Sequence, residues 1–171
     1  MFRTYVSDGD AENGGNDADN LVFGVTVSAR TVVSVTDSSD LDGFLRNTMP
    51  FTQLLGVHAL AAAPEEVRRQ VSWGPDYCTA GGVLHGGALM TLADTSGAWC
   101  AFLNLPQGAS TTTIESKTNF LRAIRTGHAM AASRPLHVGR TTMVIDTEVR
   151  DDDGRLVART TQTQAVLGSD R

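Results

Sequence analysis

The chain has 171 residues, of which 41% are hydrophobic, and its mean hydropathy is −0.11. These values are typical of one globular domain with a sizeable core, and no stretch is long and apolar enough to span a membrane. Residues 1–40 carry two basic and seven acidic side chains, which account for the net charge of −5, so the balanced remainder has no general affinity for nucleic acid. The two cysteines, Cys78 and Cys100, are too few for a disulfide framework or a zinc cluster.

The N-terminal part of the chain differs from the rest. Residues 1–40 are predicted to be an acidic, partly disordered extension, because residues 7–20 are polar and glycine-rich, whereas residues 41–171 form one domain. Residues 21–35 are predicted to be extended, either as an added edge strand or as a loosely docked arm. The N-terminus lacks the basic start and apolar run of a secretory signal, so a cytoplasmic location is expected.

Deleting residues 1–20 tests the assignment of that segment. The segment has few apolar side chains to bury, so the shortened protein is expected to keep its thermal midpoint and its activity nearly unchanged. Thermal unfolding of the full and shortened chains, followed by circular dichroism, measures the first of these properties. A large loss of either property would show that the extension is a structural part of the protein.

The domain is predicted to begin with one short helix followed by extended structure. In residues 42–57 the apolar side chains lie at helical spacing before Gly56, which provides a stop: Leu45, Phe51, Leu54 and Leu55. Residues 58–73 alternate in places between apolar and polar side chains, which predicts a strand pair or one bent strand. Residues 74–84 are predicted to be a glycine-containing loop.

The stretch from Gly86 to Pro106 is predicted to be a central helix. It carries one formal charge, Asp94, and its apolar side chains lie on almost every side of a helical wheel, which is typical of a buried core helix. A lone carboxylate there is costly unless it is paired or its shifted protonation is used. Asp94 is therefore either a structural partner of an arginine or a catalytic carboxylate, and its isolation favours the second. Cys100, in the same helix, is expected to be an inert small hydrophobe.

The rest of the domain is predicted to consist of antiparallel strands. Strand-like runs occupy residues 110–122, 128–138, 140–150 and 155–167, with turns at Val138-Gly139-Arg140 and at residues 151–154. A long apolar helix followed by hairpin-linked strands predicts an α+β fold in which an antiparallel sheet wraps around the helix.

The entry to the helix, His85-Gly86-Gly87, can supply a second reactive group. The first N–H groups of a helix lack intrahelical partners and lie at the positive end of its dipole, so the Gly86 amide suits an electron-rich oxygen. Gly86 and Asp94 are eight positions apart, roughly 12 Å along a helix, whereas a reacting carbonyl needs both groups within roughly 3 Å. We therefore predict a site at a two-fold subunit interface, where Asp94 faces the partner's Gly86. The alternative is that Asp94 caps or pairs within its own chain.

Five sequence motifs lie between residues 44 and 167: MPFTQLLGV, LHGGALMTLAD, ESKTNFLRA, HVGRTTMVIDTEVRDDDGRLVA and TTQTQAVL. Together they resemble the hotdog-fold acyl-CoA thioesterases of the phenylacetate-degradation type. The motif LHGGALMTLAD is fairly specific to this group, and the other four support the fold more than the reaction. The resemblance implies a hotdog fold, with an antiparallel sheet wrapped around one long central helix. It also implies hydrolysis of an acyl-CoA thioester to free acid and coenzyme A.

The resemblance also implies roles for individual residues. The carboxylate of Asp94 attacks the thioester carbonyl or activates a water that does, the Gly86 amide holds the thioester oxygen, and His85 lies beside it. Thr113 orients the water or the carboxylate. Substrate and coenzyme A contacts are expected from Thr79, Gly87, Arg122, Arg125, Val138, Gly139 and Arg140. No metal and no cofactor other than the coenzyme A of the substrate is expected, and relatives form homodimers that commonly pair into tetramers.

One position departs from the resemblance. Relatives often place an asparagine, sometimes a glutamine, before the glycine pair, where it polarises the thioester carbonyl, and here the position six before His85 is Thr79. Two other functions stay open. A hydratase or dehydratase of acyl thioesters would use His85 with a carboxylate, and an acyl-CoA-binding module would use neither group for catalysis. Aromatic and medium-chain acyl groups both fit the sequence.

Overall fold

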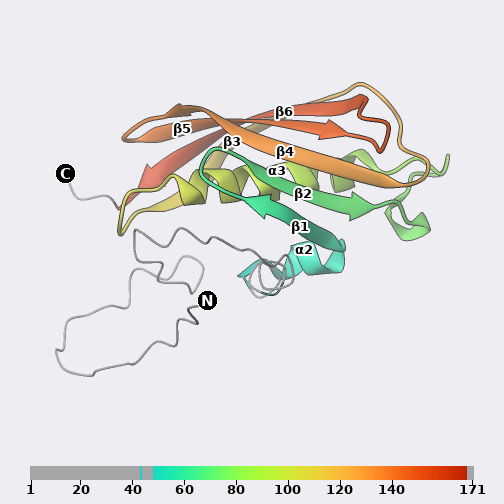
Figure 1. The fold of residues 1–171 in the computed structure, drawn as a ribbon, viewed down its shortest axis with the longest axis horizontal. Helices are drawn as coiled ribbons and strands as arrows, with labels where there is room; N and C mark the ends of the chain where they lie inside the picture. The colour runs from blue at the N-terminus through green and yellow to red at the C-terminus, as the bar shows by residue number, and fades with distance from the viewer. Residues whose placement is uncertain (1–42, 44–47, 169–171) are drawn as a thin grey trace, which may run out of the picture.

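The computed structural model describes Gly43 and residues 48–168, so the predicted extension over residues 1–40 and the side chain of Leu45 lie outside the described residues. The elements follow in the order α2 (Pro50–Leu54), β1 (Val57–Ala62), β2 (Val67–Ser72), the 3-10 helix η1 (Pro75–Tyr77), α3 (Gly86–Leu103), β3 (Ser110–Phe120), β4 (His128–Val138), β5 (Thr142–Arg150) and β6 (Leu156–Leu167). Figure 1 shows a curved sheet lying along one long helix, α3. None of the helices in this part of the chain is long and apolar enough to cross a membrane.

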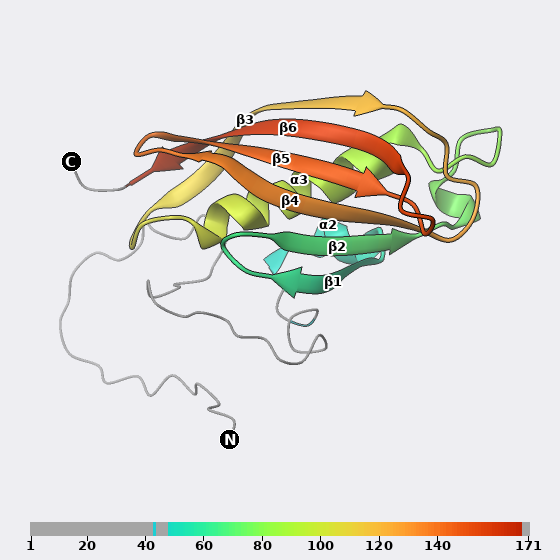
Figure 2. The ribbon, with the colours of Figure 1, turned by 45° about the horizontal axis from the view of Figure 1, so that its top comes forward.

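The six strands form one antiparallel sheet in the order β1-β2-β4-β5-β6-β3. Residues 58–73 form a strand pair, and the four strands predicted after the helix are present within two residues of their expected ends. In Figure 2, β1 and β3 lie at the two edges of the sheet and α3 runs behind its middle strands. The predicted α+β arrangement, a sheet wrapped on one long helix, is therefore confirmed.

The inner face of the sheet and one side of α3 form the core. Alternate side chains of a strand point to the same face, and on β5 Met143, Ile145 and Val149 are fully buried beneath the helix. On α3, the buried side chains include Leu92 and Cys100. The sequence predicted a helix that is buried on every side. In the single chain, however, the stripe of α3 that faces away from the sheet is only partly covered. Its members are exposed or half buried: Gly87, Met90, Thr91, Asp94 and Ala98.

Leu92→Ala is expected to destabilise the fold strongly. Leu92 has no exposed surface and lies in the main core cluster, so the substitution leaves a cavity and should lower the free energy of unfolding by about 2–5 kcal/mol. Leu136→Ala is the matched control, because Leu136 is 63% exposed and the same change there should cost less than about 0.5 kcal/mol. Urea unfolding of both variants measures the difference, and equal costs would contradict the assignment of the core.

The helix predicted over residues 42–57 is described in part, as Gly43 and Thr48 are helical and α2 follows them. α2 has five residues, and Gly56 follows it with φ +66°, a left-handed conformation that glycine adopts without strain. Leu55, at the end of the helix, is buried, whereas Phe51 and Leu54 are 61% and 73% exposed. Of the described members of the apolar stripe, Leu55 therefore packs into the core of the single chain, and Phe51 and Leu54 lie on its surface.

Candidate active site

Asp94 lies half buried in the middle of α3, and its polar partner comes from β6. Gln162 Nε2 donates a hydrogen bond to Asp94 Oδ1 at 2.5 Å and lies 3.3 Å from the backbone oxygen of Asp94. Among the described residues no ion pair includes Asp94, so an arginine does not hold it. Burial raises the pKa of the Asp94 carboxyl above its ordinary value.

The amide of Gln162 belongs to a polar cluster between β6 and β3. Thr113 Oγ1 accepts hydrogen bonds from Gln164 Nε2 at 2.9 Å and from Gln162 Nε2 at 3.3 Å. Thr111 Oγ1 in turn lies 3.1 Å from Gln164 Oε1 and 2.9 Å from the backbone oxygen of Ala165. The structure thus places Thr113 one hydrogen-bonded residue away from Asp94, on the edge strand β3.

The two glutamines were not predicted from the sequence. Gln162 is 0% and Gln164 is 1% exposed, and both point toward α3 because they lie two positions apart on β6. The sequence motif TTQTQAVL does carry a signal for them. Polar side chains that can form hydrogen bonds recur at alternate positions, on the face where a core strand normally has apolar side chains. That signal points to a polar cluster, but it does not say which helical residue lies opposite.

The N-terminus of α3 leaves one amide available. His85 is the N-cap residue, and its Nδ1 accepts the N–H of Gly87 at 2.8 Å, so this nitrogen is unprotonated and the amide of Gly87 is occupied. No hydrogen bond within the described residues uses the N–H of Gly86. A Cβ at Gly86 would lie 3.1 Å from Cζ of Phe120, so a larger residue there would press on this ring.

Gly86 and Asp94 lie on the same helix and do not meet on one carbonyl within the chain. Gly86 is the first residue of α3, and Asp94 follows about two turns later, which is roughly 12 Å along the axis. The helix is continuous through this region, from Gly86 to Leu103. Within one chain the two groups therefore lie at separate places along the helix.

The residues predicted to contact coenzyme A fall into two groups. At the N-terminal end of α3, Arg125 Nη1 donates to the backbone oxygen of Gly81 at 2.7 Å, and the N–H of Thr79 donates to Val83 in the same loop at 2.8 Å. The loop is joined to the end of the β3–β4 connection, since the N–H of Leu84 donates to Ile124 at 2.9 Å. Arg122 Nη1 donates to the backbone oxygen of Leu156 nearby, at 2.7 Å.

The turn Val138-Gly139-Arg140 is at the other end of the sheet. Its first member, Val138, is the last residue of β4, and the next strand begins at Thr142, which pairs with Ala165 near the end of β6. A Cβ at Gly139 would lie 2.7 Å from the backbone oxygen of Thr142, so the tight turn itself requires glycine there. A single chain does not bring this turn together with Arg122 and Arg125.

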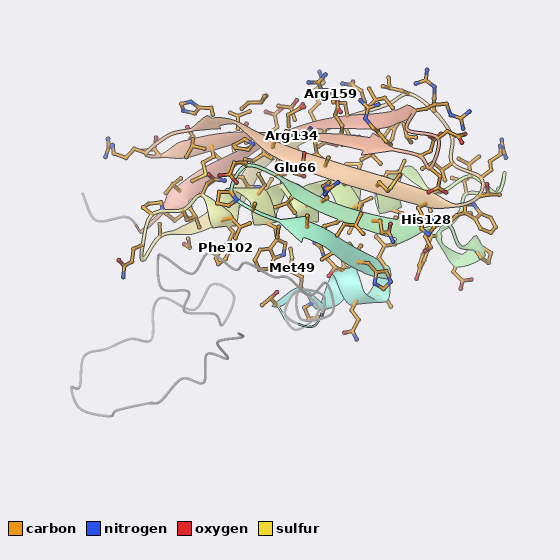
Figure 3. All side chains as sticks on the ribbon, in the orientation of Figure 1. Met49, Glu66, Phe102, His128, Arg134 and Arg159 are labelled. Carbon is orange, nitrogen blue, oxygen red and sulfur yellow. The ribbon has the colours of Figure 1, made fainter. Side chains whose placement is uncertain are left out.

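Other reactive or charged groups are accounted for by local structure. Burial, with a smaller contribution from Glu66, raises the pKa of the Cys100 thiol to about 12, as expected of an inert core cysteine. Figure 3 marks Arg134, Glu66 and Arg159 among the side chains of the sheet. Arg134 pairs with Glu66, and Arg159 pairs with Asp146 through two hydrogen bonds of 2.9 and 3.0 Å.

Comparison with known proteins identifies a family. Residues 81–158 match the model of the thioesterase superfamily, and this range includes both Gly86 and Asp94. A Mycobacterium tuberculosis protein named "Putative esterase Rv1847" is 30% identical over 125 residues, which cover 71% of this chain and 89% of that protein. The 1,4-dihydroxy-2-naphthoyl-CoA hydrolase of Escherichia coli is 33% identical over 86 residues, half of this chain and 63% of that protein.

Solved structures support the same family. A mutant thioesterase PA1618 from Pseudomonas aeruginosa is 29% identical, with a TM-score of 0.71 over 78% of this chain and 95% of that chain. A mutant of the phenylacetic acid degradation protein PaaI from Thermus thermophilus is 27% identical, with a TM-score of 0.63 over 68% of this chain and 97% of that chain. These likenesses, together with the six-stranded sheet on one helix, confirm the predicted hotdog fold.

Proposed function

Because the chain belongs to the thioesterase superfamily, we propose that it hydrolyses an acyl-CoA thioester to a carboxylic acid and coenzyme A, with Asp94 as the catalytic carboxylate. The observation that carries the proposal is the state of Asp94. It is half buried, it has no cationic partner among the described residues, and one of its oxygens is held by Gln162. A carboxylate kept in such surroundings is typical of a catalytic site. The E. coli relative named as a hydrolase of an aromatic acyl-CoA supports the substrate class.

The proposed hydrolysis requires a water molecule, the N–H of Gly86 and the carboxylate of Asp94. The N–H of Gly86 donates to the thioester oxygen, which gains negative charge as the carbonyl carbon is attacked. Asp94 either attacks that carbon itself or takes a proton from a water that attacks. The carbon–sulfur bond then breaks, the sulfur leaves as the thiol of coenzyme A after protonation, and water supplies the second oxygen of the acid. No metal or further cofactor takes part in these steps.

The proposed active unit is a two-fold dimer. Asp94 and Gly86 are too far apart on one helix, so a partner helix running antiparallel would place each Asp94 opposite the partner's Gly86. The less covered stripe of α3 supports this arrangement, since it includes Met90, which is 40% exposed. The edge strand β3 adds a second surface, with Ile114 61% exposed. Pairing of such dimers into a tetramer agrees with the resemblance and is part of the proposal.

The same symmetry gives a role to the distant turn. Antiparallel helices bring the partner's end of the sheet that carries Val138-Gly139-Arg140 toward the end of this chain that carries Arg122 and Arg125. Arginine side chains suit the phosphates of coenzyme A because they form bidentate hydrogen bonds with phosphate oxygens. Arg122, Arg125 and Arg140 are all exposed, and the bonds of the first two to backbone oxygens leave further N–H groups free to donate.

A thiol-release assay over a panel of acyl-CoAs tests the proposed reaction. The panel contains phenylacetyl-CoA and hydroxybenzoyl-CoA as aromatic substrates, octanoyl-CoA as a medium-chain substrate and 2-octenoyl-CoA as the unsaturated thioester that a hydratase would use. Hydrolysis produces one free thiol for each thioester consumed, so a colour reaction for thiols should report turnover with at least one of them. A hydratase would consume an unsaturated thioester without releasing thiol, and a binding module would retain the thioester intact. Either result would replace the proposed function.

The structure gives less support to the hydratase alternative. That chemistry needs an imidazole nitrogen that is free to exchange a proton with the substrate. In this chain Nδ1 of His85 is used to cap α3 through the N–H of Gly87. While Nδ1 accepts this hydrogen bond, neutral His85 carries its proton on Nε2, so the imidazole has no nitrogen left to take a proton from the substrate.

A further inference from the structure

We infer that Gln162 is a positioning residue for Asp94: it holds carboxylate oxygen Oδ1 and so selects Oδ2 as the oxygen that reacts. The selection of a reacting oxygen rests on the proposed function. The positioning itself does not, because it can be measured in the protein without substrate.

The side-chain amide of Gln162 contacts both the carboxyl group and the main chain of Asp94. Its Nε2 lies 2.5 Å from Oδ1 and 3.3 Å from the backbone oxygen of Asp94, so its NH2 group, which has two hydrogens to donate, bridges the side chain and main chain of the same residue. This arrangement restrains rotation about the side chain of Asp94. No hydrogen bond within the described residues uses Oδ2, which keeps its lone pairs for a proton or for a carbonyl carbon.

Neighbouring groups determine which end of the amide faces Asp94. Thr113 Oγ1 accepts from Gln164 at 2.9 Å and lies 3.3 Å from Gln162 Nε2, so it presents an acceptor to the nitrogen end. The other end, Oε1, is fully buried and has no hydrogen-bond partner within the described residues. An unpaired buried oxygen costs stability, and an apolar side chain of the same size would avoid this cost. The amide is therefore explained by what its N–H group does for Asp94.

Gly97 makes room for the amide. It lies one turn after Asp94 on α3 and is buried, and a Cβ there would lie 2.0 Å from Oε1 and 3.1 Å from Cδ of Gln162. Any side chain at this position would push the amide away from the helix. Gly97 and Gln162 thus form a matched pair across the interface between α3 and β6.

The charges around Asp94 do not obscure its titration. Asp94 is the single charged residue of α3. On the described sheet, the strand pairing places one charged residue, Arg69 of β2, on the face toward the helix. The charged residues of β3, β5 and β6 alternate with inward residues and point outward: Glu115, Lys117, Asp146, Glu148, Arg150 and Arg159. Burial, and not a neighbouring charge, raises the pKa of Asp94. A change in the hydrogen bonding of Asp94 should therefore be visible as a change in this pKa.

Titration of the Asp94 carboxyl by ¹³C NMR tests the inference directly. The resonance is assigned by its loss in Asp94→Asn, and Gln162→Met removes the donor while keeping a side chain of similar size. A hydrogen bond donated to a carboxylate stabilises its ionised form, so loss of the donor should raise the pKa of Asp94 by about one pH unit. Thr160→Val is the matched control, because Thr160 is also buried on the inner face of β6 but bonds to Thr118. The control should titrate as the wild type does.

Gly97→Ala provides a second route to the same result. It leaves Gln162 in the sequence but displaces its amide, so the pKa of Asp94 should rise in the same direction. If either folded variant titrates at the wild-type pH, or if Thr160→Val shifts the titration equally, Gln162 does not position Asp94. The thiol-release assay is independent of this outcome. A protein that cleaves no thioester but shows the shift would refute the proposed function and retain the positioning role.

Discussion

Asp94→Asn is expected to lower the turnover number for acyl-CoA hydrolysis by about 10²–10⁴-fold, the range found when a catalytic acid or base is removed. Asparagine has the same shape and can still accept the hydrogen bond from Gln162 Nε2, but it cannot attack a carbonyl or take up a proton. The loss should therefore appear in kcat much more than in KM. Steady-state kinetics with the best substrate of the acyl-CoA panel measures both parameters.

The stability of Asp94→Asn separates loss of chemistry from loss of fold. The pKa of Asp94 is raised in the folded protein, so ionisation above that pKa opposes folding, and this cost disappears when pH falls below the unfolded value. Replacing the carboxylate with a neutral amide removes the cost at neutral pH, and the variant should be at least as stable as the wild type. Hydrolysis that remains near normal in the folded variant would rule out the catalytic role of Asp94.

Two inactive variants are expected to restore activity when they share a dimer. The Asp94→Asn chain keeps its own Gly86. The Gly86→Val chain keeps its own Asp94, but its added side chain blocks the helix N-terminus, because a Cβ at position 86 would lie 3.1 Å from the ring of Phe120. Each homodimer should be inactive. In a mixed dimer, one site combines Asp94 from the blocked chain with Gly86 from the other, and that site is intact.

The amount of restored activity follows from the two-fold symmetry. A forced mixed dimer has one intact site of two, which gives about half of the wild-type activity per dimer, and random mixing gives about a quarter. The measurement is thiol release after co-refolding, with differently tagged chains to verify that mixed dimers have formed. Verified mixed dimers that stay inactive would show that each site takes both groups from one chain.

The helix and the strands were predictable because their patterns are long and regular. The apolar stretch that became α3 and the strand-like runs that became β4, β5 and β6 each extend over nine or more residues. α2 shows the opposite case. Gly56 follows the helix as predicted, but the short apolar stripe did not indicate which side chains are buried, because Phe51 and Leu54 are exposed in the single chain.

The candidate site was predictable in part for a similar reason. Asp94 and Gly86 stand out by local chemistry: one charge in an apolar helix, and one amide at a helix N-terminus. Gln162 is separated from Asp94 by 68 positions, and their contact depends on how β6 lies across α3. Sequence pattern gives the inward direction of Gln162 but not the position along the helix that it reaches. The same limit applies to Thr113, whose link to Asp94 passes through that glutamine.

Hydrolysis in ¹⁸O-labelled water tests the central claim most directly, because it follows the bond that breaks and the oxygen that enters. With the best acyl-CoA of the panel, mass spectrometry should find free coenzyme A without label and an equal amount of carboxylic acid that carries ¹⁸O from water. The wild type should form both products far above the blank, and Asp94→Asn should form them at about 10²–10⁴-fold lower rates. Neither product above the blank, or an intact thioester that has gained labelled oxygen on its acyl chain, would contradict thioester hydrolysis by Asp94.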